Sequence, residues 1–277
     1  MNRELVVNVT STEINIALCE DKVLAELSRE VAHTGFAVGD IYLGKVHKIM
    51  PGLNAAFVDV GYSKDAFLHY QDLGSFFTSF STYSKKIKKE PNKTFPIQKE
   101  TLLPEIDKKG SISNVLSTGQ EIPVQILKEP ISTKGPRLTT EISIAGRYLI
   151  LIPFGNKISV STKIASKEER NRLRQLVTSI TPKNFGVIIR TVAEGKMVAE
   201  LDNELRILVK RWEDTVGRIQ KSTAPRSVLT EIGSSEAILR DLFNSSFQNI
   251  CVNNEELYGE IRDYVGLIAP DQQNIVN

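Results

Sequence analysis

Residues 39–73 read GDIYLGKVHKIMPGLNAAFVDVGYSKDAFLHYQDL. Three short apolar runs in this stretch are separated by Gly and Pro, which is the pattern of β-strands joined by tight turns. A fourth run of the same kind, GQEIPVQILK, follows much later at residues 119–128. Short strands at this spacing predict a small closed or nearly closed β-barrel.

Alternation within LNAAFVDV (residues 53–60) divides the strand between two faces. If Ala56, Val58 and Val60 fill the barrel, Phe57 lies on its outside, and Phe67 begins the next strand. Aromatic rings interleaved with lysines on a barrel surface bind single-stranded nucleic acid, and each stacked base contributes roughly 1–3 kcal/mol. The candidate RNA-binding residues are Phe57, Phe67, Tyr42, Lys45 and Lys48. Alternation alone is equally compatible with both Phe side chains being ordinary core residues.

A lysine-rich tract separates the third and fourth strands. Residues 85–110 hold eight Lys against three Glu and one Asp, a local charge of +4. Loops this long are usually either functional or irregular. The tract is therefore either a solvated, mobile loop or an arm that contacts RNA.

The ends of the chain mix strands and helices. Residues 3–9, 13–19 and 23–27 read as three strands, which cannot bury a core alone and need a partner from later in the chain. Strand-like runs continue over 137–161, followed by a helix at 166–180 with a capping box from Ser166 and Glu169 and by the buried strand FGVIIRT at 185–191. A helix predicted near 197–220 places one face toward the core: Val198, Leu201, Leu205, Leu208, Trp212, Val216 and Ile219. Two further helices, near 236–243 and 255–268, flank a strand at 249–252. The fold class is α+β with an all-β insertion.

Composition excludes several classes of protein. The 277 residues carry 35 Lys+Arg against 33 Asp+Glu, and no apolar run approaches the roughly 20 residues that cross a bilayer. The N-terminus is interrupted by charges and does not read as a signal peptide. Cys19 and Cys251, with three scattered His, match no disulfide framework or zinc motif, which favours a reducing cytoplasm.

Several separated segments resemble the bacterial ribonuclease E/G family, closest to its ribonuclease G branch. They are residues 39–73 quoted above, TKGPRLTTEISIAGRYLILIP at 133–153, GVIIRTVAEG at 186–195 and RDLF at 240–243. The first resembles the OB-type RNA-binding domain of the ribosomal-protein-S-one class. The lysine-rich tract is longer than this family usually has there.

The resemblance implies three modules. Residues 1–36 and 232–277 would form a split RNase H-like subdomain, and 37–128 an OB-fold barrel with its lysine-rich insertion at about 72–117. Residues 129–225 would form an α+β subdomain that senses the RNA 5′ end.

The resemblance also implies site residues. Phe57 and Phe67 match an RNA-stacking pair, and Lys134 matches a lysine that contacts the RNA backbone. A 5′-phosphate pocket would contain Gly146, Ile150, Arg190 and Thr191, with Arg137 as a candidate second cation. An Arg fork suits phosphate oxygens, and Gly permits a close backbone approach. The residues alone favour Arg190 as an ordinary surface charge, and the resemblance favours the pocket.

Family members cut RNA with Mg²⁺ held by two Asp of a DNase I-like subdomain, and a CPxC motif beyond it binds zinc that joins two subunits. This chain ends in DQQNIVN, where the resemblance is about to enter that subdomain. Asp59, Asp65, Glu194 and Asp241 form no recognisable metal-binding set. We therefore expect no catalytic residue, no metal site and no bound Mg²⁺ or Zn²⁺ in this chain.

The sequence thus predicts the N-terminal, RNA-binding and 5′-monophosphate-sensing part of an endoribonuclease. The whole enzyme would act on single-stranded RNA in rRNA processing and mRNA decay, in a bacterial cytoplasm and as a homo-oligomer, and this part alone would not cut RNA. The alternatives are a stand-alone, non-catalytic RNA-binding protein and, with less support, a translation-related OB protein without preference among RNA 5′ ends.

Overall fold

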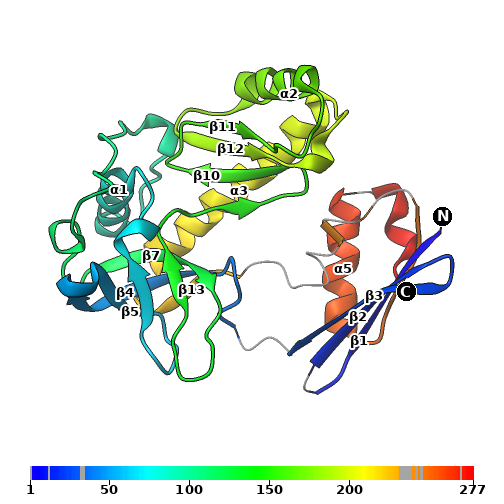
Figure 1. Cartoon of the computed structure of the whole chain (residues 1–277), viewed down its shortest axis with the longest axis horizontal. Helices are drawn as coiled ribbons and strands as arrows, with labels where there is room; N and C mark the ends of the chain where they lie inside the picture. Colours follow the sequence, from blue (N-terminus) through cyan, green and yellow to red (C-terminus); the bar gives the residue numbers. More distant parts are fainter. Residues whose placement is uncertain are drawn as a thin grey trace. The chain divides into compact units, whose positions relative to one another are not determined.

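The computed structural model describes residues 2–11, 13–31, 35–230, 239–240, 243, 246–268 and 270–277. The chain divides into two compact units (Figure 1). Unit 1 joins Met1–Gly35 to Ile232–Asn277, and unit 2 is Phe36–Glu231. No helix in the described ranges is long and apolar enough to cross a membrane.

Unit 1 is built on a four-stranded sheet in the order β14-β1-β2-β3. Its elements are β1 (Arg3–Val9), β2 (Glu13–Glu20), β3 (Val23–Val31), β14 (Phe247–Val252), helix α5 (Glu255–Ile268) and the 3-10 turn η6 (Pro270–Ile275). Strand β14 runs parallel to β1, with Leu5 opposite Ile250. The expectation that the first three strands need a distant partner is confirmed. The helix expected near 236–243 falls mostly outside the described residues.

A closed barrel forms the first half of unit 2. Its strands are β4 (Ile41–Met50), β5 (Ala55–Asp59), β6 (Ala66–His69), β8 (Arg137–Thr139) and β7 (Glu121–Lys128), and β7 pairs back onto β4. A register shift between Val46 and Lys48 bends β4, which helps this strand to pair with both β5 and β7. A further strand, β13 (Arg226–Leu229), pairs antiparallel with β4 and is not one of the barrel strands.

Burial follows the predicted alternation. Ala56, Val58 and Val60 are buried, whereas Phe57 and Asp59 are partly exposed. Ala55 departs from the pattern, because it is buried although it lies on the face of Phe57. The structure also places β8 in the barrel, so this module extends to Thr139 and not only to residue 128.

Residues 85–89 of the lysine-rich tract are helical and not part of a loop, because the insertion begins with a helix, α1 (Phe77–Lys89) (Figure 1). Phe77, Phe80, Tyr83 and Ile87 are buried on one side of it. This apolar spacing is helical and could have been read from the sequence, but the neighbouring lysines obscured it.

The second half of unit 2 is a four-stranded sheet in the order β11-β12-β10-β9 with two helices. The elements are β9 (Ile144–Ala145), β10 (Leu149–Pro153), β11 (Ile158–Val160), α2 (Lys167–Ile180), β12 (Phe185–Ile189) and α3 (Val198–Lys221). The Phe154 ring lies 5.5 Å from Phe80 of α1 and 6.4 Å from Trp212 of α3, and thereby joins this half to the insertion.

Two local expectations about the helices are corrected. Ser166 caps α2 by accepting from the Glu169 N–H at 3.1 Å, but the Glu169 carboxylate binds Arg172 and the Gly195 N–H instead of completing a capping box. Val198, expected on the buried face of α3, is 41% exposed, since it lies in the first turn of the helix.

Candidate nucleic-acid interface

Three neighbouring strands of the barrel place Lys48, Phe57 and Phe67 in one row, which we call the aromatic row. Phe57 on β5 is opposite both Lys48 on β4 and Phe67 on β6. The two rings meet edge to face, 5.9 Å apart. Both are partly exposed and lie outside the buried core, so the structure does not support the interpretation of them as core residues.

His69 extends the row along β6. Its ring lies 6.3 Å from that of Phe67 at an interplanar angle of 27°. Its Nδ1 accepts the Gln71 N–H at 3.1 Å, which fixes the ring orientation. His69 could have been selected from the sequence, because its position two residues after Phe67 places both side chains on the same face of the strand.

The structure does not bring Tyr42 to this face. The Tyr42 side chain is only 6% exposed, its ring stacks on Phe36 at 4.9 Å, and its hydroxyl accepts the Phe36 N–H. Burial raises the pKa of the phenol. Lys45, by contrast, is exposed and lies opposite Asp59 on β5 and Glu121 on β7.

A close backbone contact holds Lys134 beside the row. A Cβ on Gly135 would lie 2.2 Å from the Asp65 carbonyl oxygen, so only glycine fits there. The same segment accepts the Phe67 N–H at the Pro136 carbonyl, 2.8 Å away. Lys134 itself is exposed and is therefore presented next to Phe67.

Arg137 belongs to the barrel and not to the predicted phosphate pocket. It lies opposite Phe67, and its guanidinium donates to both carboxylate oxygens of Asp72, at 2.8 and 3.0 Å. These hydrogen bonds raise its pKa. Because Asp72 neutralises the charge, Arg137 is a poor candidate for a second phosphate-binding cation.

The predicted phosphate pocket centres on the turn between β9 and β10. The N–H groups of Arg147, Tyr148 and Leu149 all donate to the Glu204 carboxylate of α3, at 2.6, 2.8 and 2.8 Å. A Cβ on Gly146 would lie 2.9 Å from the Glu204 carboxyl carbon. Gly146 therefore permits the close approach of an internal carboxylate.

Arg190 is attached to the same turn from the end of β12. Its backbone N–H donates to the Tyr148 carbonyl at 2.8 Å, and its Nη1 donates to the Gly146 carbonyl at 2.9 Å. Thr191 is exposed, with its hydroxyl 3.1 Å from that of Ser161. Ile150 pairs with Ile188 across the two strands. The four residues predicted for the pocket thus lie around one turn, which Glu204 holds.

Two cations flank the turn at Tyr148. The Arg147 guanidinium lies 5.3 Å and the Lys196 ammonium 5.1 Å from the centre of the Tyr148 ring. A hydrogen bond to Glu200 raises the pKa of Lys196 and keeps it charged. Burial raises the pKa of the Glu204 carboxyl, which the three N–H donors partly oppose.

Glu204 could have been found from the sequence. It lies three residues after Leu201 and four before Leu208, on the apolar face of the helix. A carboxylate on a buried face requires hydrogen-bond donors, so its presence there indicates a specific partner.

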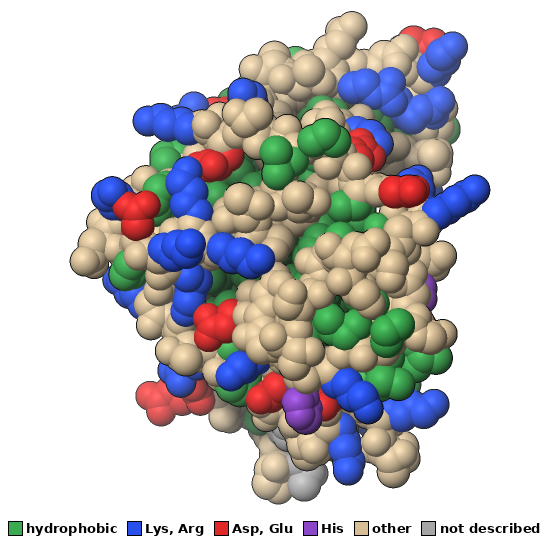
Figure 2. Space-filling view, turned by 90° about the vertical axis from the view of Figure 1, so that its left-hand side faces the viewer, with side chains coloured by type: hydrophobic (Ala, Val, Ile, Leu, Met, Phe, Trp, Pro, Cys, Tyr) green, Lys and Arg blue, Asp and Glu red, His purple; other side chains and the backbone are tan. Residues whose placement is uncertain are grey.

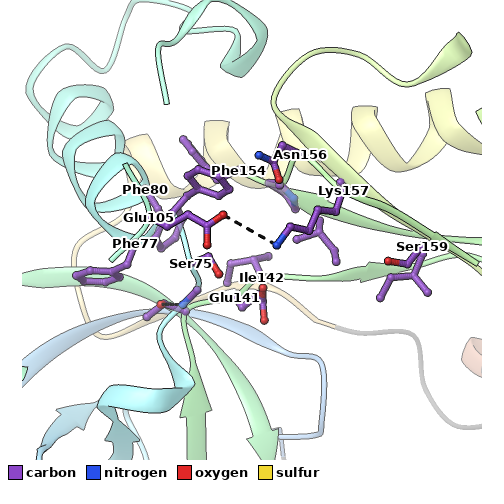
Figure 3. Close-up of a pocket in the computed structure, with 18 residues that line it drawn as sticks. Ser75, Phe77, Phe80, Glu105, Glu141, Ile142, Phe154, Asn156, Lys157 and Ser159 are labelled. Atoms are coloured by element: carbon purple, nitrogen blue, oxygen red, sulfur yellow. Dashed lines mark hydrogen bonds and ion pairs between the residues drawn. The ribbon is translucent and has the colours of Figure 1, made fainter. Parts of the chain in front are cut away.

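A hollow of about 190 Å³ lies between the barrel insertion and the second sheet (Figure 3). Glu105 and Lys157 face each other across it, with 4.0 Å between their charged atoms, and Glu141 lies on the barrel side. Two carboxylates against one ammonium do not suit a phosphate, so we assign no RNA contact to this hollow.

The acidic residues considered for catalysis do not converge. Asp59 accepts the Gly61 N–H, and Asp65 binds His47 Nδ1 at 2.7 Å. Asp241 lies outside the described residues. Among the residues that the structure describes, no group of three or more His, Cys, Asp or Glu could hold a metal ion, and Cys19 and Cys251 are free thiols.

Comparison with known proteins gives two family matches that together cover both halves of unit 2 and the end of the chain. Residues 36–141 match the S1 RNA binding domain, and residues 143–277 match the ribonuclease E/G family. The first match ends just after β8, in agreement with the barrel seen in the structure.

Individual relatives align along nearly the whole chain. Ribonuclease G of Haemophilus influenzae is 34% identical over 97% of this chain and 51% of its own length. Ribonuclease G of Escherichia coli K12 is 32% identical over 98% of this chain and 52% of its own length. Ribonuclease E of Nostoc sp. is 33% identical over 82% of this chain and 29% of its own length. The chain spans about half the length of the ribonuclease G relatives that it matches.

Proposed function

The chain belongs to the ribonuclease E/G family and contains an S1 RNA-binding domain, and from this premise we propose that it binds single-stranded RNA and recognises a 5′-monophosphate. The aromatic row binds the bases. The turn held by Glu204, with Arg190 and Thr191, binds the 5′ end.

The observation that carries RNA binding is the partly exposed ring pair with a lysine on either side. Phe57 and Phe67 offer two faces for stacking, Lys48 lies in register with them, and Gly135 fixes Lys134 nearby. Stacking on rings tolerates any base, and lysines meet the phosphates between bases. This arrangement suits a single strand, because the bases of a duplex are not free to stack.

Recognition of the 5′ end is supported by the cations around the turn. Arg190 offers a planar fork anchored to the Gly146 carbonyl, and Thr191 adds an exposed hydroxyl. Arg147 adds positive charge beside them, whereas the charge of Lys196 is paired with Glu200. A terminal phosphomonoester carries about −1.5 to −2 charge and three acceptor oxygens, more than an internal diester, which favours the 5′ end at such a site.

For the whole protein we propose an endoribonuclease of rRNA processing and mRNA decay, acting on single-stranded RNA in the bacterial cytoplasm as a homo-oligomer. In this proposal the 277 residues bind RNA but do not cut it, and Mg²⁺ and Zn²⁺ act outside them. The separate positions and partners of Asp59 and Asp65 support this, since metal-assisted hydrolysis needs carboxylates aimed at one phosphate.

The test is a binding titration with one labelled single-stranded RNA carrying either a 5′-monophosphate or a 5′-hydroxyl. We expect tighter binding of the monophosphate, and we expect Arg190→Ala to remove that difference while leaving affinity for the hydroxyl form unchanged. Equal affinity of the wild type for both RNAs would overturn the sensor. Absence of RNA binding would overturn the whole proposal, and cleavage by the pure chain with Mg²⁺ would overturn the non-cutting assignment.

A further inference from the structure

Lys85, Lys88 and Lys89 of α1 border one hollow, and Lys45 of β4 lies opposite Glu121, which binds Lys88. We call these four lysines the lysine patch. Lys88 binds Glu121 at 3.2 Å and also donates to the Ser222 carbonyl. Lys85 and Lys89 are exposed, and neither is paired with a carboxylate in the part of the chain that the structure describes. Viewed from the side on which α1 lies, Lys and Arg side chains are numerous on both halves of the face (Figure 2).

The three helical lysines border a hollow of about 490 Å³. Its other wall is the loop 117–120 that precedes β7, which contributes Ser117, Thr118 and the backbone of Gly119. Hydroxyl groups and lysines around one open hollow match the acceptor oxygens of a phosphodiester.

The patch is continuous with the aromatic row. Lys88 contacts Glu121, Glu121 is opposite Lys45, and Lys45 is opposite Asp59. Asp59 follows Phe57 by two residues, so their side chains share the outer face of β5, about 7 Å apart along the strand. Lys45 of the lysine patch is therefore only two residues along the strands from the position of Phe57.

The charge balance favours a polyanion. The four lysines face two carboxylates, those of Glu121 and Asp59, and Lys88 already neutralises the first. Ammonium groups on flexible stems act as point charges without fixed geometry, which suits a repeating backbone better than one specific anion.

We propose that the lysine patch binds the phosphodiester backbone of the same single strand that stacks on the aromatic row. It would give longer RNAs a second contact, and it is a surface formed by the insertion. The inference rests on the proposed RNA binding.

The test is Lys85→Gln/Lys89→Gln in the full chain, measured with single-stranded RNAs of two lengths, one that spans only the aromatic row and one several-fold longer. We expect unchanged affinity for the short RNA and on the order of tenfold weaker binding of the long RNA near 0.1 M salt. The slope of log affinity against log salt should fall by about 1.4 for the long RNA, since each lost phosphate contact removes about 0.7.

The matched control is Lys183→Gln/Lys210→Gln, which removes the same charge from another exposed part of unit 2. Equal losses in the control and the test variant, or equal losses with both RNA lengths, would overturn the patch as a specific contact. Unchanged binding of the long RNA would overturn it too. In that case, loss of binding in Phe57→Ala would show that the proposed RNA-binding function still stands.

Discussion

The aromatic row and the turn held by Glu204 are built in opposite ways. The row consists of side chains that project from regular strands, and the interior of the barrel beneath them is filled by other residues such as Val58 and Leu68. The turn consists of backbone atoms and an arginine held together by a buried carboxylate. The first region can change without disturbing the fold, whereas the second is part of the fold.

This difference fits two kinds of recognition. Stacking on Phe57 and Phe67 needs only exposed ring surface and tolerates motion and any base. Distinguishing a phosphomonoester from a hydroxyl needs donors fixed within a few tenths of an ångström, which the network around Glu204 supplies. The comparison predicts that stability and RNA affinity respond separately to substitutions in the two regions.

The largest effect is expected for Glu204→Ala. It leaves the N–H groups of Arg147, Tyr148 and Leu149 without their acceptor in a mostly buried site. We expect the free energy of unfolding to fall by on the order of 3 kcal/mol, measured by urea denaturation. Glu213→Ala, at an exposed position of the same helix, should change it by less than about 0.5 kcal/mol. Equal effects of the two variants would mean that the turn does not depend on Glu204.

Phe57→Ala should weaken RNA binding and leave the free energy of unfolding largely unchanged. Loss of a stacking surface is expected to weaken single-stranded RNA binding by about 1–3 kcal/mol in a titration. Unfolding should be far less affected than in Leu68→Ala, a core truncation on the next strand that costs about 2–5 kcal/mol. A core-like loss of stability with unchanged RNA affinity would refute the assignment of the row to RNA.

A smaller effect is expected for Glu204→Gln, which keeps the shape of the side chain but replaces one acceptor oxygen with an NH₂ group. The turn should persist with a local shift where the NH₂ group meets a backbone N–H, and this shift moves the Gly146 carbonyl that anchors Arg190. The preference for 5′-monophosphate RNA should therefore fall severalfold, with affinity for 5′-hydroxyl RNA unchanged.

The pH dependence of that preference separates a positioning role from a purely structural one. Burial raises the pKa of Glu204 above its ordinary value of 4.5, so protonation should begin to weaken the wild-type preference above that pH. The Gln variant should lack this step. The free 5′-phosphate is the same in both experiments, so we expect the difference between the two pH profiles to follow the titration of Glu204.

The barrel could be predicted because its pattern is local. Gly and Pro mark the turns, and alternation separates Phe57 from Ala56, Val58 and Val60. Alternation left open whether Phe57 and Phe67 face the core or the solvent, and the resemblance favoured the solvent. The burial of Tyr42 could not be predicted from this pattern. Tyr42 belongs to the same strand as Lys45, but it is covered by Phe36, which stacks on it from outside the barrel strands.

The second region could not be predicted in the same way, because it is assembled from residues distant in sequence. Arg190, Gly146 and Glu204 meet only after β10, β12 and α3 have packed. The resemblance identified the first two, but the carboxylate that holds the turn was missed. Arg137 was misplaced for a related reason: the strands that follow it, from Ile144 onward, belong to the second sheet, whereas its own strand pairs with β6 and β7.

The smallest expected effect concerns a second carboxylate near the turn. Glu169 accepts hydrogen bonds from Arg172 and from the Gly195 N–H, and thereby anchors the segment that follows Arg190 and Thr191. The Arg172 hydrogen bonds, followed by the Gly195 N–H, lower the pKa of Glu169 from 4.5 to about 2. The folded state therefore gains stability from the ionised group above pH 4.5 and loses it progressively as the pH falls toward 2.

Glu169→Gln should consequently flatten the fall in unfolding free energy between those two pH values, as measured by urea denaturation at a series of pH values. Glu168→Gln is the comparison, because Glu168 is the exposed neighbour in the same helical turn. A backbone hydrogen bond and the Ser166 hydroxyl lower the pKa of Glu168 as well, so this variant should flatten the profile less. A larger flattening in Glu169→Gln would show that internal carboxylates hold this region on both sides of Arg190, by Glu204 before it and by Glu169 after it. Identical acid profiles for the two variants would leave Glu204 as the only such anchor among the contacts described. The structural difference between the turn and the aromatic row would then depend on the Glu204 side chain.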